Sequence, residues 1–368
     1  KSFAHLHAHT EYSMLDGAAK IEPFLNRILE LEQPGAAITD HGNLYGALEF
    51  HDLAIKKDLK PVIGYEAYVI ADSRFERPDR ANNKRYHLTL LAENTVGYWN
   101  LVEMASRAFT EGYYYKPRID YELLEKYSEG IIALSGCLGG EIAQLLAPDA
   151  SVEEGNQGQT RSYDDALKKA EFYQSIFGNE NFFIELHKHG IKQQDDILPD
   201  LLKISQELSA PLVATNDSHY VRQDGASAHD ALLCVQTNAT LDDENRFKFD
   251  GGGYYLKSSK EMRTLFPDKD YPDACNNTLK ILDRANYEFG KNTYYLPDFP
   301  MEDKDKSIDE FLKEQVYVGA NNLYDKLTTE IKERIDYELE VIESMGFASY
   351  FLIVGDLINY AKSKGIRT

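Results

Sequence analysis

The chain of 368 residues is long for one domain and short for three, so its length favours two domains. Its 61 acidic and 40 basic residues give a formal net charge of −21, which argues against a protein that coats nucleic acid through bulk charge. Hydrophobic residues make up 43% of the chain, enough to build a sizeable core, so general disorder is excluded.

The cysteine content and the N-terminus indicate a cellular compartment. The three cysteines, Cys137, Cys234 and Cys275, are too few for a disulfide framework and favour a reducing, cytoplasmic setting. No apolar run approaches the roughly 18 residues that a membrane span needs. The N-terminus also lacks a basic-then-apolar export signal. We therefore expect a cytoplasmic protein with no membrane partner.

Short apolar runs alternate with amphipathic stretches over the first 215 residues. The apolar runs predict seven strands, at Phe3–His7, Gly35–Thr39, Pro61–Ile70, Tyr86–Ala92, Gly130–Ser135, Asn181–His187 and Pro211–Thr215. The stretches between them predict helices at Ile21–Leu31, Leu44–Ile55, Val96–Phe109, Tyr163–Ile176 and Ile197–Leu208. This alternation predicts a largely parallel α/β sheet, and polar residues at the strand ends favour a closed barrel with a site at one rim.

Two segments interrupt this alternation, and helical patterns follow them. Pro148–Asp164 is polar and predicts a surface excursion, and Phe249–Tyr255 predicts a seam, because three glycines are flanked there by aromatic residues. A helical pair follows at Glu330–Ser344 and Tyr350–Ala361, the second strongly apolar on one side. We expect that apolar face to be exposed or packed against the barrel, to promote self-association, and to belong to a fragment whose packing partner is missing.

Residues of the metal-ligand type lie mostly at strand ends. His7 and His9 end the first strand and share one face, with about 7 Å between their positions. Glu66 lies within an apolar run, which is costly unless the carboxylate is paired or bound to a cation. Six strands and one loop supply the whole set: His7, His9, Asp16, His41, Glu66, His87, Cys137, Asp217 and His219.

Strand ends of a parallel barrel converge at one rim, so these residues predict a single site. Imidazoles, carboxylates and one thiolate suit Zn²⁺, Mn²⁺ or Fe, and so many ligands fit two or three ions rather than one. Clustered divalent ions polarise a phosphate ester and activate a water molecule at neutral pH. The composition of the set therefore predicts a metal-dependent phosphoesterase.

Each residue also has a simpler interpretation. A lone histidine at a strand end is more often structural than a ligand, and Cys137 alone would be a small core residue. Asp40 fits a turn or a cap, so we leave it outside the ligand set. His187-Lys188-His189 repeats the His-X-His spacing and competes for a ligand role, against the alternative of a surface strand end. The joint occurrence of these motifs at strand ends favours the metal site.

Phe3–Gly17 resembles the first motif of the polymerase-and-histidinol-phosphatase (PHP) domain of bacterial replicative DNA polymerase III alpha subunits. The later motifs of that domain follow in order, at Thr39–Gly42, Gly64–Tyr68, Ser135–Cys137 and Ala214–Tyr220. Glu338–Asn359 resembles the entry into the palm domain of the same enzymes, most clearly in Met345–Phe347 and Tyr350–Val354. The resemblance covers nearly the whole chain.

This resemblance implies a distorted seven-stranded β/α barrel with a trinuclear metal site and a helical C-terminal extension. All nine ligand positions of the family are filled, which resembles members whose domain acts as a metal-dependent 3′–5′ exonuclease, and Asp217, His219 and His9 would be its catalytic residues. Members that lack several ligands keep the domain as a scaffold for a separate proofreading exonuclease subunit. The expected parts are residues 1–235 as the barrel, 236–322 as its remainder and a connection, and 323–368 as the start of the palm.

The same resemblance implies the partners. They would be the 3′ end of a DNA primer, the remaining palm, thumb and fingers of the polymerase, and a proofreading exonuclease subunit. The palm motif rich in Gly and Ser and the aspartates for nucleotidyl transfer are not in this chain, so we do not expect it to polymerise DNA by itself. Two alternatives stay open: a scaffold in which metals only stabilise the barrel, and a small-molecule phosphatase of the histidinol-phosphate type.

Local charge predicts where a DNA end would bind. A loop before His87 carries five cations and two acids: Arg74, Arg77, Arg80, Lys84 and Arg85, with Glu76 and Asp79. Tyr113–Arg118 places aromatic residues beside cations, a combination that suits a frayed single strand, although an ordinary solvated loop is the alternative for the first segment. We expect Lys116, Arg118 and His189 to contact the substrate.

Overall fold

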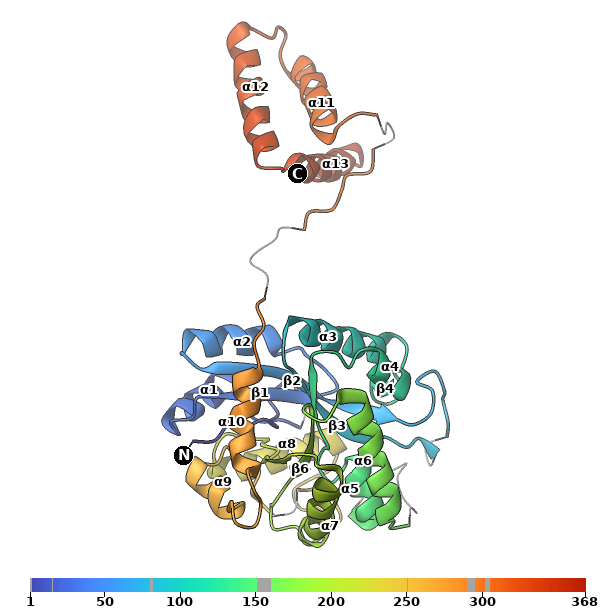
Figure 1. Ribbon diagram of the computed structural model, residues 1–368. Coiled ribbons are helices and arrows are strands. Elements are labelled where there is room, and N and C mark those ends of the chain that lie inside the picture. Colours follow the sequence, from blue (N-terminus) through green and yellow to red (C-terminus); the bar gives the residue numbers. More distant parts are fainter. Residues whose placement is uncertain are drawn as a thin grey trace. The chain divides into compact units, whose positions relative to one another are not determined.

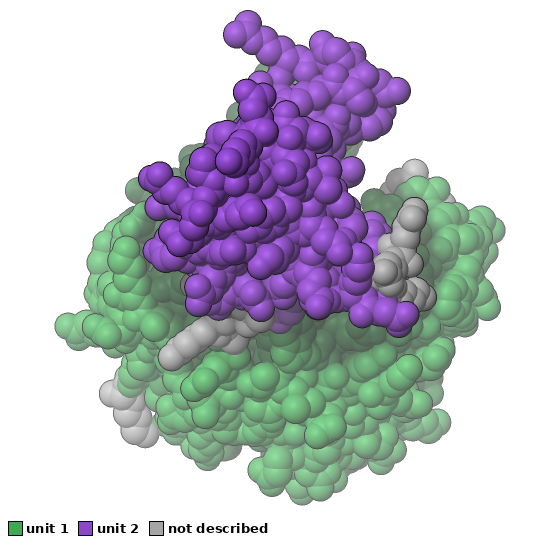
Figure 2. All heavy atoms as spheres, turned by 90° about the horizontal axis from the view of Figure 1, so that it is seen from above, with its two compact units in different colours: residues 1–289 green, residues 290–368 purple. Residues whose placement is uncertain are grey.

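The computed structural model describes residues 2–14, 16–79, 82–150, 160–249, 251–289, 295–301 and 305–368. The chain divides into two compact units, residues 1–289 and 290–368, which Figure 2 shows in different colours. The first unit contains the sheet and the second consists of helices. The three-part division at residues 235 and 322 stays a prediction. Arg80 and most of the expected excursion, residues 151–159, lie outside the described residues.

The first unit is built on one mixed sheet of seven strands, in which the main path runs β1-β2-β3-β5-β6-β7 and β4 pairs with β2. The strands are β1 Gly35–His41, β2 Lys60–Ile70, β3 Tyr86–Ala92, β4 Arg118–Asp120, β5 Ile131–Leu134, β6 Phe182–Leu186 and β7 Leu212–Ala214. β3 runs antiparallel to both β2 and β5, whereas the other pairings are parallel. The sheet is therefore more mixed than the sequence pattern predicted.

The N-terminal segment joins the two ends of the curled sheet. Ala37 N on β1 donates to His5 O at 2.7 Å, and His9 N donates to Ser218 O, just after β7, at 2.8 Å. Because these contacts are single bridges and not a continuous ladder, Phe3–His7 is extended chain and not the regular strand expected from its apolar character. The predicted fold class, a distorted β/α barrel with a helical C-terminal extension, is confirmed.

Helices lie around the outside of this sheet (Figure 1). They are α1 Ile21–Glu30, α2 Ala47–Lys56, α3 Thr95–Thr110, α4 Tyr121–Lys126, α5 Glu141–Leu146, α6 Tyr163–Phe177, α7 Lys192–Leu208, α8 Ala226–Thr237, α9 Ser259–Leu265 and α10 Ala274–Arg284, with short 3₁₀ turns at Pro148–Ala150 and Gln223–Gly225. Ile21, Phe24, Leu25 and Ile28 illustrate the helical spacing: all four are buried on one face of α1. The sequence pattern did not predict β4, α4 or α5, because three to six residues carry too little periodicity. α7 begins five residues before the predicted start at Ile197.

The interior of the sheet is layered, because alternate residues of a strand point to the same face. The lowest layer is apolar and packs against Ile281 and Leu282 of α10: Ala37, Val62, Leu91, Ile132, Phe183 and Val213. Two residues further along the strands lie the polar side chains Thr39, Thr89, Glu185 and Thr215, all buried. The next residues on the same face are His41, Glu66, His87 and Asp217. The apolar layer thus supports a polar one, and the polar layer supports the rim.

The second unit contains three helices, α11 Ile308–Leu323, α12 Thr329–Ser344 and α13 Ala348–Ser363. Its small core is formed by Leu312, Ala348 and Leu352, but much of α13 is exposed, including Leu357 at 63% and Tyr360 at 62%. Exposure of this helix agrees with the sequence expectation. Among the described residues, no single helix is long and apolar enough to cross a membrane. α12 and α13 pass that test only together, with a 116° bend between them.

Candidate metal centre

The strand register brings three of the predicted ligands side by side at the rim. His41, the last residue of β1, pairs with Glu66 on β2, and Tyr68 two residues further pairs with His87 on β3. Since His87 lies at the start of its strand, a parallel β3 would carry it to the opposite rim. The antiparallel direction of β3 is the reason that this imidazole joins the others.

Glu66 lies at the centre of one half of the site. Its carboxylate is 2.7 Å from His41 Nδ1, 3.1 Å from His87 Nδ1 and 3.4 Å from His7 Nε2. Burial opposes ionisation of this side chain, but the surrounding imidazoles hold its pKa well below the usual range. The sequence analysis expected burial of Glu66 to be unfavourable unless the carboxylate was paired, and the surrounding imidazoles provide that pairing.

Two aspartates complete the opposite half. Asp217 Oδ1 lies 3.1 Å from His9 Nε2 and 3.5 Å from His219 Nδ1, while Asp16 Oδ2 lies 2.9 Å from His41 Nε2. Asp217 has a φ of +42°, a left-handed conformation that is uncommon outside glycine and asparagine and recurs at functional sites. This backbone turn follows β7 directly and aims the carboxylate at the histidines.

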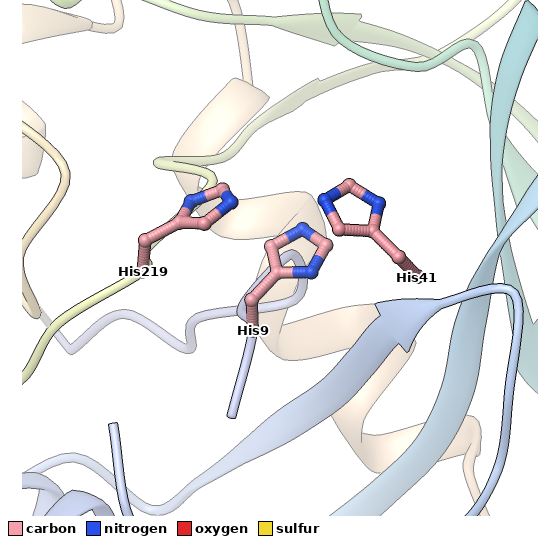
Figure 3. Close-up of side chains that lie close together, drawn as sticks. All are labelled: His9, His41 and His219. Atoms are coloured by element: carbon pink, nitrogen blue, oxygen red, sulfur yellow. The ribbon is translucent and has the colours of Figure 1, made fainter. Parts of the chain in front are cut away.

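The imidazoles of His9, His41 and His219 lie close together (Figure 3). The ring of His9 lies 4.2 Å from that of His41 and 4.3 Å from that of His219, centroid to centroid. Their ligand nitrogens lie within 4.8 Å of one another, as do the ligand atoms of His7, His9 and Glu66 and those of His41, Glu66 and His87. The three groups share members, so they form one continuous centre.

Cys137 reaches the same centre from the turn after β5. Its Sγ lies 3.5 Å from both Glu66 Oε1 and His87 Nδ1. Gly136, with a φ of +91°, lets the turn approach β3, since a Cβ there would lie 2.6 Å from His87 O. Burial, with Glu66 nearby, raises the pKa of the thiol to about 11. Binding of a metal by this sulfur would therefore release a proton.

The donor set fits divalent metal ions. Seven ligand-type atoms in the cluster are buried without a hydrogen bond of acceptable geometry: His7 Nε2, His9 Nε2, Asp16 Oδ1, His41 Nδ1, Glu66 Oε2, Asp217 Oδ1 and His219 Nε2. Buried polar atoms are almost always satisfied in folded proteins, so a group of orphans that face one another indicates a missing partner. All nine predicted ligand residues come together here, and their nitrogen, oxygen and sulfur atoms are those that bind Zn²⁺, Mn²⁺ or Fe.

The histidines titrate differently within the cluster. Burial and the neighbouring rings of His41 and His219 lower the pKa of His9 to about 3. Burial also opposes charge on His41, but Glu66 and Asp16 raise its pKa to about 9. At neutral pH without metal, His9 is therefore neutral and His41 carries a proton that a metal ion would displace.

Sequence reasoning missed Glu185, which lies directly below the cluster on β6. Its carboxylate accepts from His7 Nδ1 at 2.7 Å, from Thr215 Oγ1 at 2.5 Å and from Gly136 N at 2.9 Å. The hydrogen bond to Nδ1 leaves Nε2 of His7 as the atom that faces Glu66 and Asp217. The available signal was a carboxylate inside an apolar run, the same signal that identified Glu66.

Asp40 lies outside the cluster, as the sequence interpretation held. It is buried and accepts hydrogen bonds from Thr10 N at 2.6 Å and from Ser13 Oγ at 2.8 Å. Ser13 Oγ in turn lies 2.9 Å from His9 Nδ1. Asp40 therefore fixes the loop that carries His9 and does not face the centre.

The three predicted substrate contacts differ in their environment. Lys116 is half-buried, with its Nζ 5.2 Å from the Tyr68 ring, which stacks on His41 at 6.0 Å. Arg118 is buried and donates to four oxygens of the surrounding loops: Gly112 O, Asn83 Oδ1, Arg74 O and Glu76 O. His189 uses both ring nitrogens within the protein, near Gln194 and Asn216 O. Only Lys116 has the position of a substrate contact.

The basic loop before His87 is largely occupied by internal contacts. Arg74 is buried and paired with Glu111 at 2.6 Å and with Asp120 at 3.0 Å. Arg77 donates to Arg74 O and Glu111 O. These contacts favour the simpler interpretation, a loop whose cations serve its own structure.

Two family models match this chain, one in each of its two compact units. The fold and the histidine-rich rim are those of a PHP domain: the family model described as "PHP domain" matches residues 5–189, and the chain belongs to this family. A second model, "Bacterial DNA polymerase III alpha NTPase domain", matches residues 310–368.

The curated relatives identify the kind of protein that contains such a chain. The chain is 42% identical over 368 residues to the DNA polymerase III subunit alpha of Borreliella burgdorferi, covering 99% of the chain and 31% of the relative. It is 43% identical over 386 residues to that of Saccharopolyspora erythraea, again covering 99% of the chain and 31% of the relative. The resemblance predicted from sequence is confirmed, and the chain spans about a third of the length of these relatives.

Solved structures show weaker likeness. An amidohydrolase from Chromobacterium violaceum matches with a TM-score of 0.39 and 13% identity, over 60% of this chain and 88% of that one. A two-domain protein from Bacteroides vulgatus, described as containing a predicted PHP-like metal-dependent phosphoesterase, matches with a TM-score of 0.36 and 10% identity, over 77% and 69% of the two chains.

Proposed function

We propose that this chain is the PHP-containing part of a replicative DNA polymerase alpha subunit and that it hydrolyses the terminal phosphodiester of a DNA 3′ end, as a metal-dependent 3′–5′ exonuclease. The observation that carries the proposal is the complete ligand set: nine residues from the N-terminal segment, β1, β2, β3 and the turns after β5 and β7 meet, and seven of their buried atoms lack a hydrogen bond of acceptable geometry. A purely structural cluster would be expected to satisfy its polar atoms internally.

The residues have distinct tasks in this proposal. Two or three ions of Zn, Mn or Fe held there would polarise the phosphate and activate a water molecule. His7, His9, Asp16, His41, Glu66, His87, Cys137, Asp217 and His219 would hold them. Asp217, His9 and His219 form the group in which Asp217 Oδ1 lies within 3.5 Å of both imidazoles, so they would position the reacting phosphate. Lys116, next to Tyr68 at the rim, would contact the phosphate of the strand.

Replacement of Asp217 tests this function. We expect Asp217→Asn to lower the rate of 3′-end cleavage by at least about 100-fold, because the amide is neutral and a poor metal ligand. Asp283→Asn, a change at an exposed carboxylate of α10, is the control and should retain the wild-type rate. Cleavage of a mismatched primer by both variants at the wild-type rate would overturn the proposal.

The scaffold function gives a different result. If the ions only stabilise the barrel, their removal lowers the melting temperature while no divalent ion supports cleavage. A phosphatase of the histidinol-phosphate type would release phosphate from small monoesters and leave a primer intact. Assaying both substrates with the metal-loaded chain separates these functions from the exonuclease.

A further inference from the structure

A hollow of about 290 Å³ lies beside the metal centre. Its lining combines aromatic rings with polar and charged side chains, among them Tyr220, His229, Asp230, Lys248, Phe249 and Tyr254. The volume is close to the lower end of small-ligand pockets, about 300 Å³, and so suits one nucleoside better than a longer strand. None of the residues assigned to the metal centre lines it.

Aromatic contacts connect the hollow to the predicted ligand His219. The ring of Phe249 lies 4.7 Å from that of His219 and 4.7 Å from that of Tyr254. His219 N also donates to Tyr254 O at 2.8 Å, and His229 Nε2 lies 2.8 Å from Asp16 O. The wall of the hollow is therefore tied to the backbones of two predicted ligands.

A glycine turn gives the wall its shape. Gly251 and Gly252 have φ values of +96° and +84°, and a Cβ on Gly251 would lie 2.1 Å from His189 O. Glycine alone permits this approach, which lets Phe249 and Tyr254 converge from the two sides of the turn. The ring of His189 then stacks on Tyr254 at 4.0 Å and holds it in place. This turn was the aromatic-flanked triplet that the sequence analysis expected only as a seam.

The charges of the hollow suit an anionic ligand with a planar ring. Asp230 is neutralised by Arg246, whose two terminal nitrogens lie 2.5 and 2.6 Å from its oxygens. Lys248 adds an exposed positive charge at the same wall. Phe247, 46% exposed, lies 5.9 Å from Phe249 and continues the aromatic surface outward. Aromatic faces beside cations are the combination that binds single-stranded nucleic acid.

We propose that this hollow binds the 3′-terminal nucleobase of the DNA strand, with Phe249 as the stacking face and Lys248 beside the terminal phosphate. The inference rests on the proposed function for the identity of the strand. It places the last base against the wall that adjoins His219, so that the last phosphodiester faces the metal centre. Because the hollow would bind a planar ring by stacking alone, it would accept any of the four bases.

Binding of two small probes to the whole metal-loaded chain tests the pocket. dAMP carries a base and deoxyribose 5-phosphate does not, so calorimetry should show about 10-fold tighter binding of dAMP to the wild type, as expected for one stacked base. Phe249→Ala should remove that preference, and Phe249→Leu, which keeps an apolar side chain and the fold, should reduce it. Trp99→Ala, at an exposed ring of α3, should leave it unchanged.

Equal affinity of the wild type for the two probes, or a preference for dAMP that survives in both Phe249 variants, would contradict the proposal that the hollow binds a base. That result can be distinguished from a failure of the proposed exonuclease activity. If the chain cleaves a primer but binds dAMP no more tightly than deoxyribose 5-phosphate, only the proposed base-binding role of the hollow is contradicted. If the chain prefers dAMP in a way that depends on Phe249 but does not cleave a primer, base binding in the hollow is supported and the exonuclease activity is contradicted.

Discussion

At the residue scale, the site depends on carboxylates that the protein buries under histidines. Glu185 is an example: it lies outside the predicted ligand set, in a fourth group with His7 and His187 whose ligand atoms lie within 4.8 Å of one another. Its contacts to His7, Thr215 and Gly136 determine which nitrogen of His7 faces Glu66 and Asp217. A carboxylate behind a ligating histidine fixes the ring and increases its basicity. The buried layer below the rim is therefore part of the metal centre's function.

Glu185→Gln should weaken metal affinity about 10–100-fold, because the amide is a poorer acceptor for His7 Nδ1–H. Chelator competition measures this effect, and activity is not required for it. Glu141→Gln is a matched control, since Glu141 is also buried and accepts from the hydroxyls of Tyr121 and Tyr173, away from the ligands. Equal losses of metal affinity in both variants would show that Glu185 acts only through stability.

Metal binding should tighten as the pH rises. Three predicted ligands carry a proton at pH 7 that an ion must displace: His7, whose pKa, against the effect of burial, the carboxylates of Glu185, Asp217 and Glu66 raise well above its usual value, His41, with a pKa of about 9, and Cys137, with a pKa of about 11. The pKa values of Asp16, Glu66 and Asp217 are lowered, so these groups stay ionised and contribute no proton. With three protons displaced, the apparent affinity should then rise about 1000-fold per pH unit between about pH 6 and 8.

The number of protons released, measured by calorimetry in two buffers of different ionisation enthalpy, checks this prediction. Cys137→Ser should release one proton fewer than the wild type and so lower the pH slope by about one third on a logarithmic scale. An affinity that does not change with pH would contradict the protonation states assigned to His7, His41 and Cys137.

At the scale of secondary structure, the direction of one strand and the exposure of one helix have the largest consequences. β3 brings His87 to the rim because it runs against its neighbours. α13 packs against Leu312 of α11 through its residues Ala348 and Leu352, whereas its residues Phe351, Leu357 and Ile358 remain partly exposed. Exposed apolar groups clustered on one helix favour association with another apolar surface.

We expect the chain to self-associate through α13 in a concentration-dependent way. Leu357→Lys should shift sedimentation toward the monomer, because it places a charge on the exposed apolar surface. Leu48→Lys is the control: Leu48 on α2 is 57% exposed, close to the 63% of Leu357. A wild-type chain that stays monomeric at high concentration would refute the expectation.

At the scale of the whole molecule, the first unit contains every element that the metal centre uses. Its last residues are needed as well: Tyr287 OH accepts from Ile63 N at 2.5 Å and donates to Pro61 O at 3.1 Å. Phe289 packs edge-on against His51 at 4.3 Å. The barrel thus ends with the segment that follows α10.

A chain shortened to residues 1–289 should fold and bind as many ions per molecule as the full chain. A chain shortened to residues 1–284 should melt at a lower temperature, because the backbone groups of Ile63 and Pro61 would lose the hydroxyl of Tyr287. Elemental analysis and thermal melting of both products provide the measurement. Loss of metal from the longer product would show that the second unit contributes to the centre.

The sequence alone determined the ligand types, the alternation of strands and helices, and the family. Periodicity of two and of 3.6 residues is local, so β2, β3 and α3 were predicted to within one or two residues. Only the tertiary structure decided the direction of β3, the joining of His5–His9 to both ends of the sheet, the place of Glu185 beneath His7, and the internal role of Arg118. These features depend on hydrogen bonds between residues far apart in the chain, which no local pattern encodes.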